Sequence, residues 1–293
     1  MSDKIVVSGA SGTLGRLVLE RLLSLGHAGR VVAVTRSPEK LAAFASRGVE
    51  LRAGDFDHAA SLKSAFAGVK QALVISTDVL DVPGHRVRQH TSAFRALVEA
   101  GAAHIAYTSI VNPERSRILI SKDHAESEVA LRESGVCYTV LRDNIYSQML
   151  LDGAKRAVAS GKLVDAREHG KVGYVSREDV ADVAAAVLER PPAASQVLDV
   201  TGPAALGGAE IAALLSELSG RKVEHQSIPL AALVDGMVQH GLPRPLAEIY
   251  ASFDAGVAAG ELAVTSDVVQ RFTGSAPESL SEFLRRNRAA WAA

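Results

Sequence analysis

KIVVSGASGTLG, residues 4–15, is the stretch from which the fold can be predicted. Its apolar run, Ile5 to Val7, leads directly into three glycines, Gly9, Gly12 and Gly15, and then into a segment with helical periodicity. A strand, a tight turn and a helix in this order are typical of the first unit of a dinucleotide-binding sheet.

The glycines of this turn have a physical reason. The chain must reverse tightly, a pyrophosphate must approach the backbone without meeting a Cβ atom, and the helix must pack closely on its strand. The free amides and the dipole at the start of the helix then form an anion site. The spacing is GxxGxxG and not the GxGxxG of the usual dinucleotide-binding fingerprint. The prediction of nucleotide binding therefore depends on the position of the glycines between a strand and a helix. We expect the turn to bind phosphates through Gly9, Ser11, Gly12, Thr13, Leu14 and Gly15.

The composition of the 293 residues is that of a globular protein, with 47% hydrophobic and 22% charged residues. A net charge of -1 does not argue for nucleic acid or an anionic membrane as a partner. No apolar run approaches the roughly 18 residues of a membrane span, and a strand so close to the N-terminus leaves no room for a signal peptide. We therefore expect a cytoplasmic protein; a homodimer is compatible with the sequence.

Strand and helix patterns alternate along the first half of the chain, which predicts an α/β fold with a Rossmann-like, doubly wound parallel sheet. We expect residues 1–150 to form the dinucleotide-binding domain, with a strand and a helix that return to it from about 171–200. Residues 151–170 and 201–293 are expected to form a smaller, mostly helical substrate lobe. Residues 161–170 are expected to be a polar loop and residues 172–175 a short strand, after which Ser176 would be the N-cap of the next helix. His85 and His90 are five residues apart, which is the wrong spacing for a shared ligand face, so we predict no metal.

The end of the second predicted strand bears on the choice of cofactor. An acidic residue there would bind the 2′-hydroxyl of NAD, whereas this chain reads Thr35-Arg36-Ser37. A guanidinium pairs with a 2′-phosphate, so NADPH is favoured. Alternatively, Arg36 is only a solvated arginine. Lys40, one turn into the next helix, is either a second phosphate partner or surface charge.

Polar residues follow three other predicted strands at the same edge of the sheet, where ligands bind in this fold. Asp55 and Phe56 follow the third strand and are expected beside the adenine, although a plain turn with a core phenylalanine explains them almost as well. The ends of the fourth and fifth strands are expected to face the nicotinamide side of the crevice and supply Ser76, Thr77, Thr108 and Ser109.

Several motifs together resemble a known family. They are GASGTLG at 9–15, TRSPEKL at 35–41, AGDFD at 53–57, YTS at 107–109, DHAESE at 123–128 and GVCYTVLRDNIYS at 135–147. The chain resembles an atypical short-chain dehydrogenase/reductase of the NmrA-like group, with a pattern closest to the NAD(P)H:quinone oxidoreductase and triphenylmethane reductase branch. The resemblance implies that Asn144, Ile145 and Tyr146 touch the nicotinamide or cover the substrate. For Tyr146, packing at a strand end is the alternative.

The chain departs from ordinary short-chain dehydrogenases, which use a Tyr-xxx-Lys pair as acid and activator. None of the five tyrosines is followed by lysine at that spacing. In the related phenylpropanoid ether reductases a lysine lies on the helix before this last motif, and His124 takes its place here. His124 is either a residue that exchanges a proton near neutral pH or a structural histidine bonded to a neighbouring carboxylate such as Glu128.

Two classes of function fit these features. One is an NADPH-dependent reductase that transfers hydride to a quinone or a similar flat acceptor, with His124 and Tyr146 as candidate catalytic residues. A quinone tolerates the missing Tyr-xxx-Lys pair because its reduced oxyanion can take a proton from water. The other is a non-catalytic NADP(H)-binding sensor of the NmrA type. Reduction or isomerisation of a specific biosynthetic intermediate is a third reading.

Overall fold

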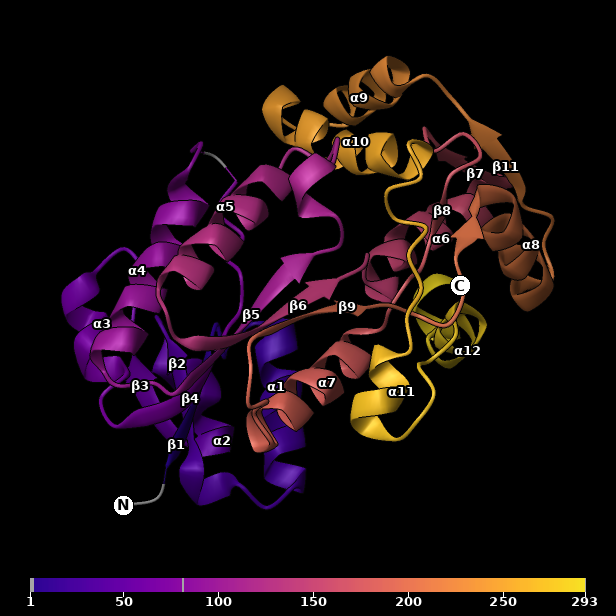
Figure 1. Ribbon diagram of the computed structural model, residues 1–293. Coiled ribbons are helices and arrows are strands. Elements are labelled where there is room, and N and C mark those ends of the chain that lie inside the picture. Colours follow the sequence, from indigo (N-terminus) through magenta and orange to yellow (C-terminus); the bar gives the residue numbers. More distant parts are fainter. Residues whose placement is uncertain (1–2, 81, 293) are drawn as a thin grey trace. The chain divides into compact units, whose positions relative to one another are not determined.

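The computed structural model describes residues 3–80 and 82–292 and divides the chain into two compact units (Figure 1). Unit 1 consists of Met1–Ser109, Asp123–Arg142 and Val180–Leu198. Unit 2 consists of Ile110–Lys122, Asp143–Asp179 and Asp199–Ala293. Each unit is therefore assembled from segments that are distant in the sequence.

A seven-stranded sheet with the order β3-β2-β1-β4-β5-β6-β9 is the centre of unit 1. The first strand lies inside the sheet, and the chain winds outward from it in both directions, which confirms the predicted doubly wound fold. Strands β1 to β5 pair in parallel. The strands are β1 (Lys4–Ser8), β2 (Val31–Thr35), β3 (Glu50–Ala53), β4 (Val69–Val74), β5 (His104–Ile110), β6 (Cys137–Asp143) and β9 (Gln196–Val200).

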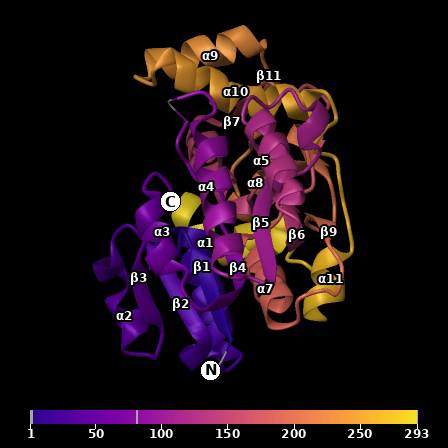
Figure 2. The same cartoon turned by 60° about the vertical axis from the view of Figure 1, so that its left-hand side comes forward.

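Helices cover this sheet. The side chains of α3, α4 and α5 form one core cluster with strand residues such as Val6, Val32 and Ile105. Arg21 of α1 pairs with Asp182 of α7, and Figures 1 and 2 show these two helices side by side. The helices are α1 (Thr13–Ser24), α2 (Ala42–Ala45), α3 (Ala59–Ala65), α4 (His85–Glu99), α5 (Ser121–Glu133) and α7 (Arg177–Glu189), with 3-10 turns η1 (Ala28–Arg30) and η2 (Pro38–Leu41).

The sequence explains why β1 and α1 form where they do. Ile5, Val6 and Val7 are fully buried, as is typical of a parallel strand covered on both faces. Val18 and Leu22, four residues apart, are fully buried on one face of α1. This alternation of an apolar strand and a one-sided apolar helix places the intervening glycine turn at the carboxyl edge of the sheet.

Unit 2 has a separate apolar core in which Trp291, Phe283 and Leu284 are almost completely buried. Its helices are α6 (Leu151–Ser160), α8 (Gly208–Ser219), α9 (Leu230–Gln239), α10 (Arg244–Ala258), α11 (Val268–Thr273), α12 (Leu280–Arg286) and α13 (Arg288–Trp291), with η3 (Pro113–Arg115) and η4 (Ser147–Leu150). Two small sheets pair β8 (Lys171–Val172) with β10 (Leu206–Gly207) and β7 (Lys162–Asp165) with β11 (Glu224–Ser227). Within the described residues, no helix is long and apolar enough to cross a membrane.

Two sequence-based expectations for unit 2 need correction. Residues 161–170 were expected to be a polar loop, but residues 162–165 form β7 because β11 supplies a parallel partner about sixty residues later. The strand expected at residues 172–175 is cut to Lys171–Val172. After Val172, the amide of Gly173 donates to Leu262 O, and that of Val175 donates to Ile145 O, so these backbone groups bond to other segments.

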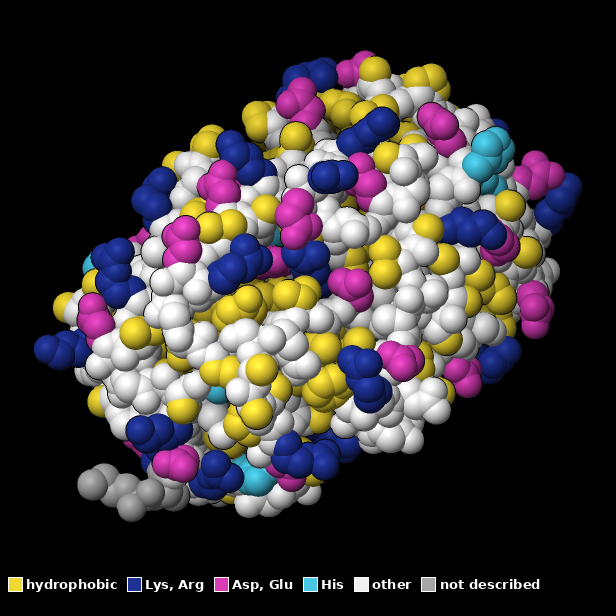
Figure 3. All heavy atoms as spheres, in the orientation of Figure 1, with side chains coloured by type: hydrophobic (Ala, Val, Ile, Leu, Met, Phe, Trp, Pro, Cys, Tyr) yellow, Lys and Arg dark blue, Asp and Glu magenta, His cyan; other side chains and the backbone are white. Residues whose placement is uncertain are grey.

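Charged side chains of both signs are interspersed on the face drawn in Figure 3. This distribution agrees with the net charge of -1 and gives that face no extended field of a single sign.

Candidate functional site

The glycine turn after β1 has the geometry that requires glycine. Gly9 has a φ of +62°, in the left-handed region that side chains disfavour. A Cβ atom at Gly15 would lie 2.5 Å from Gly9 O and 2.7 Å from Ala10 Cα, so the helix could not pack this closely with any other residue. The amide of Gly12 donates to Gly9 O at 3.0 Å and closes the turn.

Helix α1 begins at this turn without a capping side chain. Gly12 is the N-cap residue, no side chain accepts from the first amides, and the first turn contains no acidic residue. The Ser11 hydroxyl lies 2.8 Å from Thr35 Oγ1, which ties the turn to the end of β2. The amides and the positive end of the helix dipole can therefore bind an anion, as the phosphates of a dinucleotide require.

Three basic residues lie around this turn. Arg36 follows β2 directly, and both Arg36 and Lys40 are exposed. Arg16, which the sequence analysis missed, donates from Nε to Ser11 O at 3.1 Å and from Nη2 to Lys40 O at 2.7 Å. It thereby links the glycine turn to η2. The signal that could have found it is a guanidinium placed immediately after GxxGxxG.

Asp55 and Phe56 both take part in the local turn after β3. The Asp55 carboxylate accepts from the amide of Asp57 at 3.0 Å and lies 3.2 Å from Nδ1 of His58. Phe56 is half-buried and packs against the core of unit 1. These contacts are those of a plain turn that carries a core phenylalanine, which was the alternative to a role beside the adenine.

The segment after β4 is fixed from two directions. The amide of Ser76 donates to Thr108 Oγ1 of β5 at 2.9 Å. The amide of Thr77 donates to His90 Nε2 at 3.0 Å, while Thr77 O accepts from Arg86 Nε at 2.8 Å. Side chains of β5 and α4 therefore set the backbone position of this predicted cofactor-binding segment.

Ser109 and Arg142 share a buried carboxylate, Glu128. The Ser109 hydroxyl donates to Oε1 at 2.6 Å, and Arg142 donates to both oxygens, at 3.0 Å from Nε and 2.6 Å from Nη2. Glu128 is only 2% exposed, so this bidentate pair compensates its burial. The suggestion that Glu128 bonds to His124 is therefore wrong.

His124 is a neutral, buried hydrogen-bonding group. Arg86 Nη2 lies 3.0 Å from His124 Nε2, and because a guanidinium can only donate, Nε2 must be the unprotonated acceptor. The proton is then on Nδ1, which donates to Tyr107 Oη at 3.1 Å. Burial, reinforced by the charge of Arg86, lowers the pKa of His124 well below its ordinary value. Proton exchange by His124 near neutral pH therefore has no support from this geometry.

His90 completes the buried cluster and has the same kind of fixed tautomer. Its Nε2 accepts from the amide of Thr77, so Nδ1 carries the proton and donates to Ser127 Oγ at 2.8 Å. Burial, followed by the charge of Arg86, lowers the pKa of His90 to about 3. His90 and His124 are thus structural donors and acceptors at neutral pH.

Asn144 and Ile145, directly after β6, are held by unit 2 itself. Asn144 Nδ2 donates to Leu262 O at 3.0 Å and to Val264 O at 3.3 Å, and Oδ1 accepts from the amide of Ile145 at 2.9 Å. Asn144 is 3% exposed, and Ile145 belongs to the core of unit 2. Because both amide hydrogens are in use, this side chain anchors the backbone after β6.

Tyr146 is paired with Asp143, a residue that the sequence analysis did not single out. Tyr146 Oη donates to Asp143 Oδ2 at 2.7 Å, and the Arg177 guanidinium lies 4.9 Å from the centre of the tyrosine ring. Burial raises the pKa of Asp143 to about 8. Burial and the adjacent Asp143 together raise the pKa of Tyr146 well above its ordinary value. The available signal was a carboxyl group ending the apolar run of β6.

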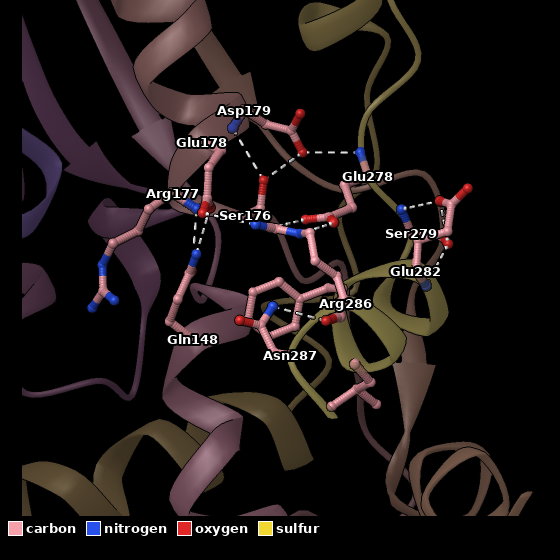
Figure 4. A network of polar contacts seen from close by, with 12 residues as sticks. Gln148, Ser176, Arg177, Glu178, Asp179, Glu278, Ser279, Glu282, Arg286 and Asn287 are labelled. Carbon is pink, nitrogen blue, oxygen red and sulfur yellow. Dashed lines mark hydrogen bonds and ion pairs between the residues drawn. The ribbon is translucent and has the colours of Figure 1, made fainter. Parts of the chain in front are cut away.

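A polar network fixes the start of α7 (Figure 4). Arg177, in the first turn of this helix, also lies over the ring of Tyr146. Ser176 Oγ accepts from the amide of Asp179 at 3.0 Å, as predicted for an N-cap. Asp179 Oδ2 accepts from the amide of Glu278 at 3.0 Å, and Gln148 Oε1 accepts from that of Arg177 at 3.1 Å. Figure 4 shows the Arg177 side chain pointing away from these contacts.

The fold and the glycine turn define a dinucleotide-binding α/β protein, and the comparisons with known proteins narrow the class. The sequence matches the NmrA-like family over residues 1–284. The chain belongs to the NmrA-like family.

Three similar proteins are oxidoreductases. The structure of the NADPH-dependent quinone oxidoreductase of Escherichia coli, complexed with NADPH, has a TM-score of 0.92 and 33% identity, covering 96% of this chain and 99% of that chain. The triphenylmethane reductase of Citrobacter sp., complexed with NADP(H), has a TM-score of 0.89 and 34% identity, covering 97% and 99%. The NAD(P)H azoreductase of Xenophilus azovorans is 31% identical over 290 residues, 99% of each chain.

Proposed function

We propose that this protein is an NADPH-dependent reductase that transfers a hydride to a quinone or a similar flat, electrophilic acceptor. The observation that carries the proposal is the uncapped start of α1 behind a turn that only glycine can form. Its position in a doubly wound sheet is where a dinucleotide binds. The relatives that use NADPH, NADP(H) or NAD(P)H cover nearly the whole chain.

The cofactor would be held mainly by residues of unit 1. The amides at Gly12 to Gly15 bind the pyrophosphate, and Arg36, with Lys40, pairs with the 2′-phosphate. Ser76 and Thr77, positioned by Thr108, His90 and Arg86, meet the nicotinamide ribose. When bound, NADPH supplies the hydride. The remaining residues proposed for the cofactor are Asp55, Phe56, Ser109, Asn144 and Ile145.

The acceptor would be recognised by Tyr146, which lies just after β6. An aromatic ring can stack on a flat acceptor, and the Arg177 guanidinium above Tyr146 restrains that ring. Quinones and cationic dyes suit the site because neither strictly requires the Tyr-xxx-Lys pair that the sequence lacks.

The competing proposal is a sensor that binds NADP(H) without turnover. One observation favours the sensor. His124, which was expected to exchange protons, is neutral and fixed in one tautomer by its two hydrogen bonds. The two proposals separate when NADPH oxidation is followed with benzoquinones, naphthoquinones and triarylmethane dyes. We expect oxidation well above background with at least one acceptor. NADPH binding without oxidation by any acceptor would support the sensor instead.

A further inference from the structure

The pair of Asp143 and Tyr146 lies where a reacting acceptor is expected. Asp143 is the last residue of β6, and ligands of doubly wound sheets bind beyond the carboxyl ends of the strands. Tyr146 follows three residues later, is half-buried, and donates to Asp143 Oδ2 at 2.7 Å. The pair thus places the phenol of a half-buried tyrosine in direct contact with a buried carboxyl group.

The same segment has unused hydrogen-bonding capacity. Asp143 Oδ1 and Ser147 Oγ are both buried, and neither has a hydrogen-bond partner among the described residues. Buried polar atoms in native proteins are normally paired with protein, water or ligand. Two such atoms within five residues indicate a segment that interacts with something other than its own chain.

Other proton donors suggested by the sequence are already in use. His124 accepts from Arg86 through Nε2 and donates to Tyr107 through Nδ1. The Ser109 hydroxyl donates to Glu128 at 2.6 Å. Because these groups are committed within unit 1, the Asp143 and Tyr146 pair is the strongest remaining source of a proton for an acceptor.

We propose that Tyr146 donates its phenolic proton to the oxygen of the reduced acceptor, and that Asp143 replaces that proton along the hydrogen bond between Oδ2 and Oη. The proposal rests on the reductase function proposed above. It specifies how the site protonates acceptors whose reduction leaves a negative charge on an oxygen atom. Tyr146 is then a catalytic residue, and Asp143 is a positioning residue that acts through it.

The atoms and charges balance in this step. For this step the hydrogen bond of the resting pair reverses: the phenolic hydrogen turns from Asp143 Oδ2 to the acceptor oxygen, and the protonated Oδ2 donates to Oη. Hydride addition leaves a negative charge on the acceptor oxygen, which takes the Tyr146 proton while the phenolic oxygen takes the proton of Asp143 Oδ2. Asp143 ends as a carboxylate and recovers its proton from water. Before the step the carboxyl group is protonated at neutral pH, because burial raises the pKa of Asp143 to about 8. Among the described residues, the charged or titratable groups that face it are Tyr146 and, across the tyrosine ring, Arg177.

The first test compares two acceptors in Asp143→Asn and Tyr146→Phe. A quinone forms an oxyanion on reduction, whereas a cationic triarylmethane dye takes hydride on carbon and needs no proton. We expect the ratio of quinone to dye kcat to fall about tenfold in each variant, which is less than general acid catalysis usually contributes because water can partly substitute. The exposed Asp152→Asn in the same unit is the control and should leave the ratio unchanged.

The pH profile distinguishes proton delivery from a merely structural role. Quinone reduction by the wild type should decline as the pH rises through about 8, where Asp143 loses its proton, and Asp143→Asn should lack this decline. If kcat falls equally with the quinone and the dye, and the pH profile of quinone reduction is unaltered, the pair has only a structural role. Failure of the wild type with every acceptor would instead overturn the proposed function, and with it the role of the pair.

A second test is independent of turnover. Carbon-13 NMR of the aspartate carboxyl groups, in the protein without cofactor, should reveal one group that titrates near pH 8 in the wild type and in Asp152→Asn. That signal should be absent from Asp143→Asn. If every aspartate of the wild type titrates in the ordinary acidic range, Asp143 holds no proton at neutral pH and the proposal is overturned.

Discussion

Arg86 determines the state of several other residues at once. Its Nε donates to Thr77 O, and its Nη2 donates to His124 Nε2, although it is only 3% exposed. A buried guanidinium is tolerated when a carboxylate is near, and Asp123 Oδ2 lies 3.6 Å from Nη1, a nitrogen that makes no hydrogen bond among the described residues. This one side chain therefore fixes both the loop after β4 and the tautomer of His124.

Gly15→Ala tests the close approach of α1 to the turn. The new Cβ would meet Gly9 O at 2.5 Å and Ala10 Cα at 2.7 Å, and both are backbone atoms that cannot move aside cheaply. We expect NADPH affinity to fall at least tenfold and the free energy of unfolding to fall by about 1–3 kcal/mol. Isothermal titration calorimetry and urea unfolding measure the two effects.

Gly29→Ala is the matched control for this substitution, since a Cβ there has no atom within 4 Å. It should leave both quantities within experimental error. Wild-type affinity in Gly15→Ala would show that the turn does not hold the phosphates as proposed.

Arg36→Ala tests the choice of cofactor. If its guanidinium pairs with the 2′-phosphate, the substitution should weaken NADPH binding about tenfold or more and leave NADH binding nearly unaltered. Fluorescence titration with each nucleotide measures the ratio, with the exposed Arg95→Ala as a charge-matched control. Equal losses for the two nucleotides, or none, would mean that Arg36 is only a solvated arginine.

At the scale of elements, the two ends of α7 are in different units, because Arg177 to Asp179 belong to unit 2 and the rest belongs to unit 1. The start of the helix is fixed by a buried cap. Ser176 is 1% exposed, accepts from the amide of Asp179 and donates to its carboxylate at 2.9 Å. The same carboxylate accepts from Glu278, so the cap also holds the segment before α12.

Ser176→Ala should therefore destabilise the protein by about 1–2 kcal/mol, at the upper end of the range for N-caps, because the half-buried Asp179 carboxylate also loses a donor. Thermal or urea unfolding followed by circular dichroism measures the loss. Ser279→Ala is the comparison, because Ser279 caps α12 in a partly exposed position and should cost less. A larger loss at Ser279 would contradict this ranking.

At the scale of the whole molecule, buried histidines make stability depend on pH. Burial lowers the pKa of His90 to about 3 and of His104 to about 4, and lowers that of His124 well below its ordinary value. At pH 5 these three histidines are neutral in the folded protein but protonated in the unfolded chain. Asp143 contributes to the pH dependence of stability with the opposite sign. Its pKa is raised on folding, so at pH 5 it holds a proton only in the folded state.

The unfolded chain thus binds two more protons than the folded protein at pH 5 from these groups. The free energy of unfolding should then fall by about 3 kcal/mol for each pH unit of acidification near pH 5. Urea unfolding at closely spaced pH values measures this slope. His104→Gln should reduce the slope by about 1.4 kcal/mol per unit, and Asp143→Asn should increase it by the same amount. A slope of zero in the wild type would contradict the assigned protonation states.

The predicted fold is confirmed because it depends on patterns within short stretches. Glycine spacing, the apolar strand and the N-cap at Ser176 act over a few residues, so they are visible in the sequence. The pairing of residues 162–165 was missed because its partner strand lies about sixty residues away and its pattern is mostly polar. Local chemistry therefore determined the elements, while distant pairing determined one of the strands.

What the sequence by itself determined was the doubly wound sheet and the glycine turn, because both follow from spacing along the chain. What only the tertiary structure decided was the chemical state of buried polar residues, whether or not the sequence had singled them out. His124 is neutral because Arg86, 38 residues away, donates to it, and Asp143 holds its proton because folding buries it at the end of β6. Protonation depends on burial and on partners, and both exist only once the chain has folded.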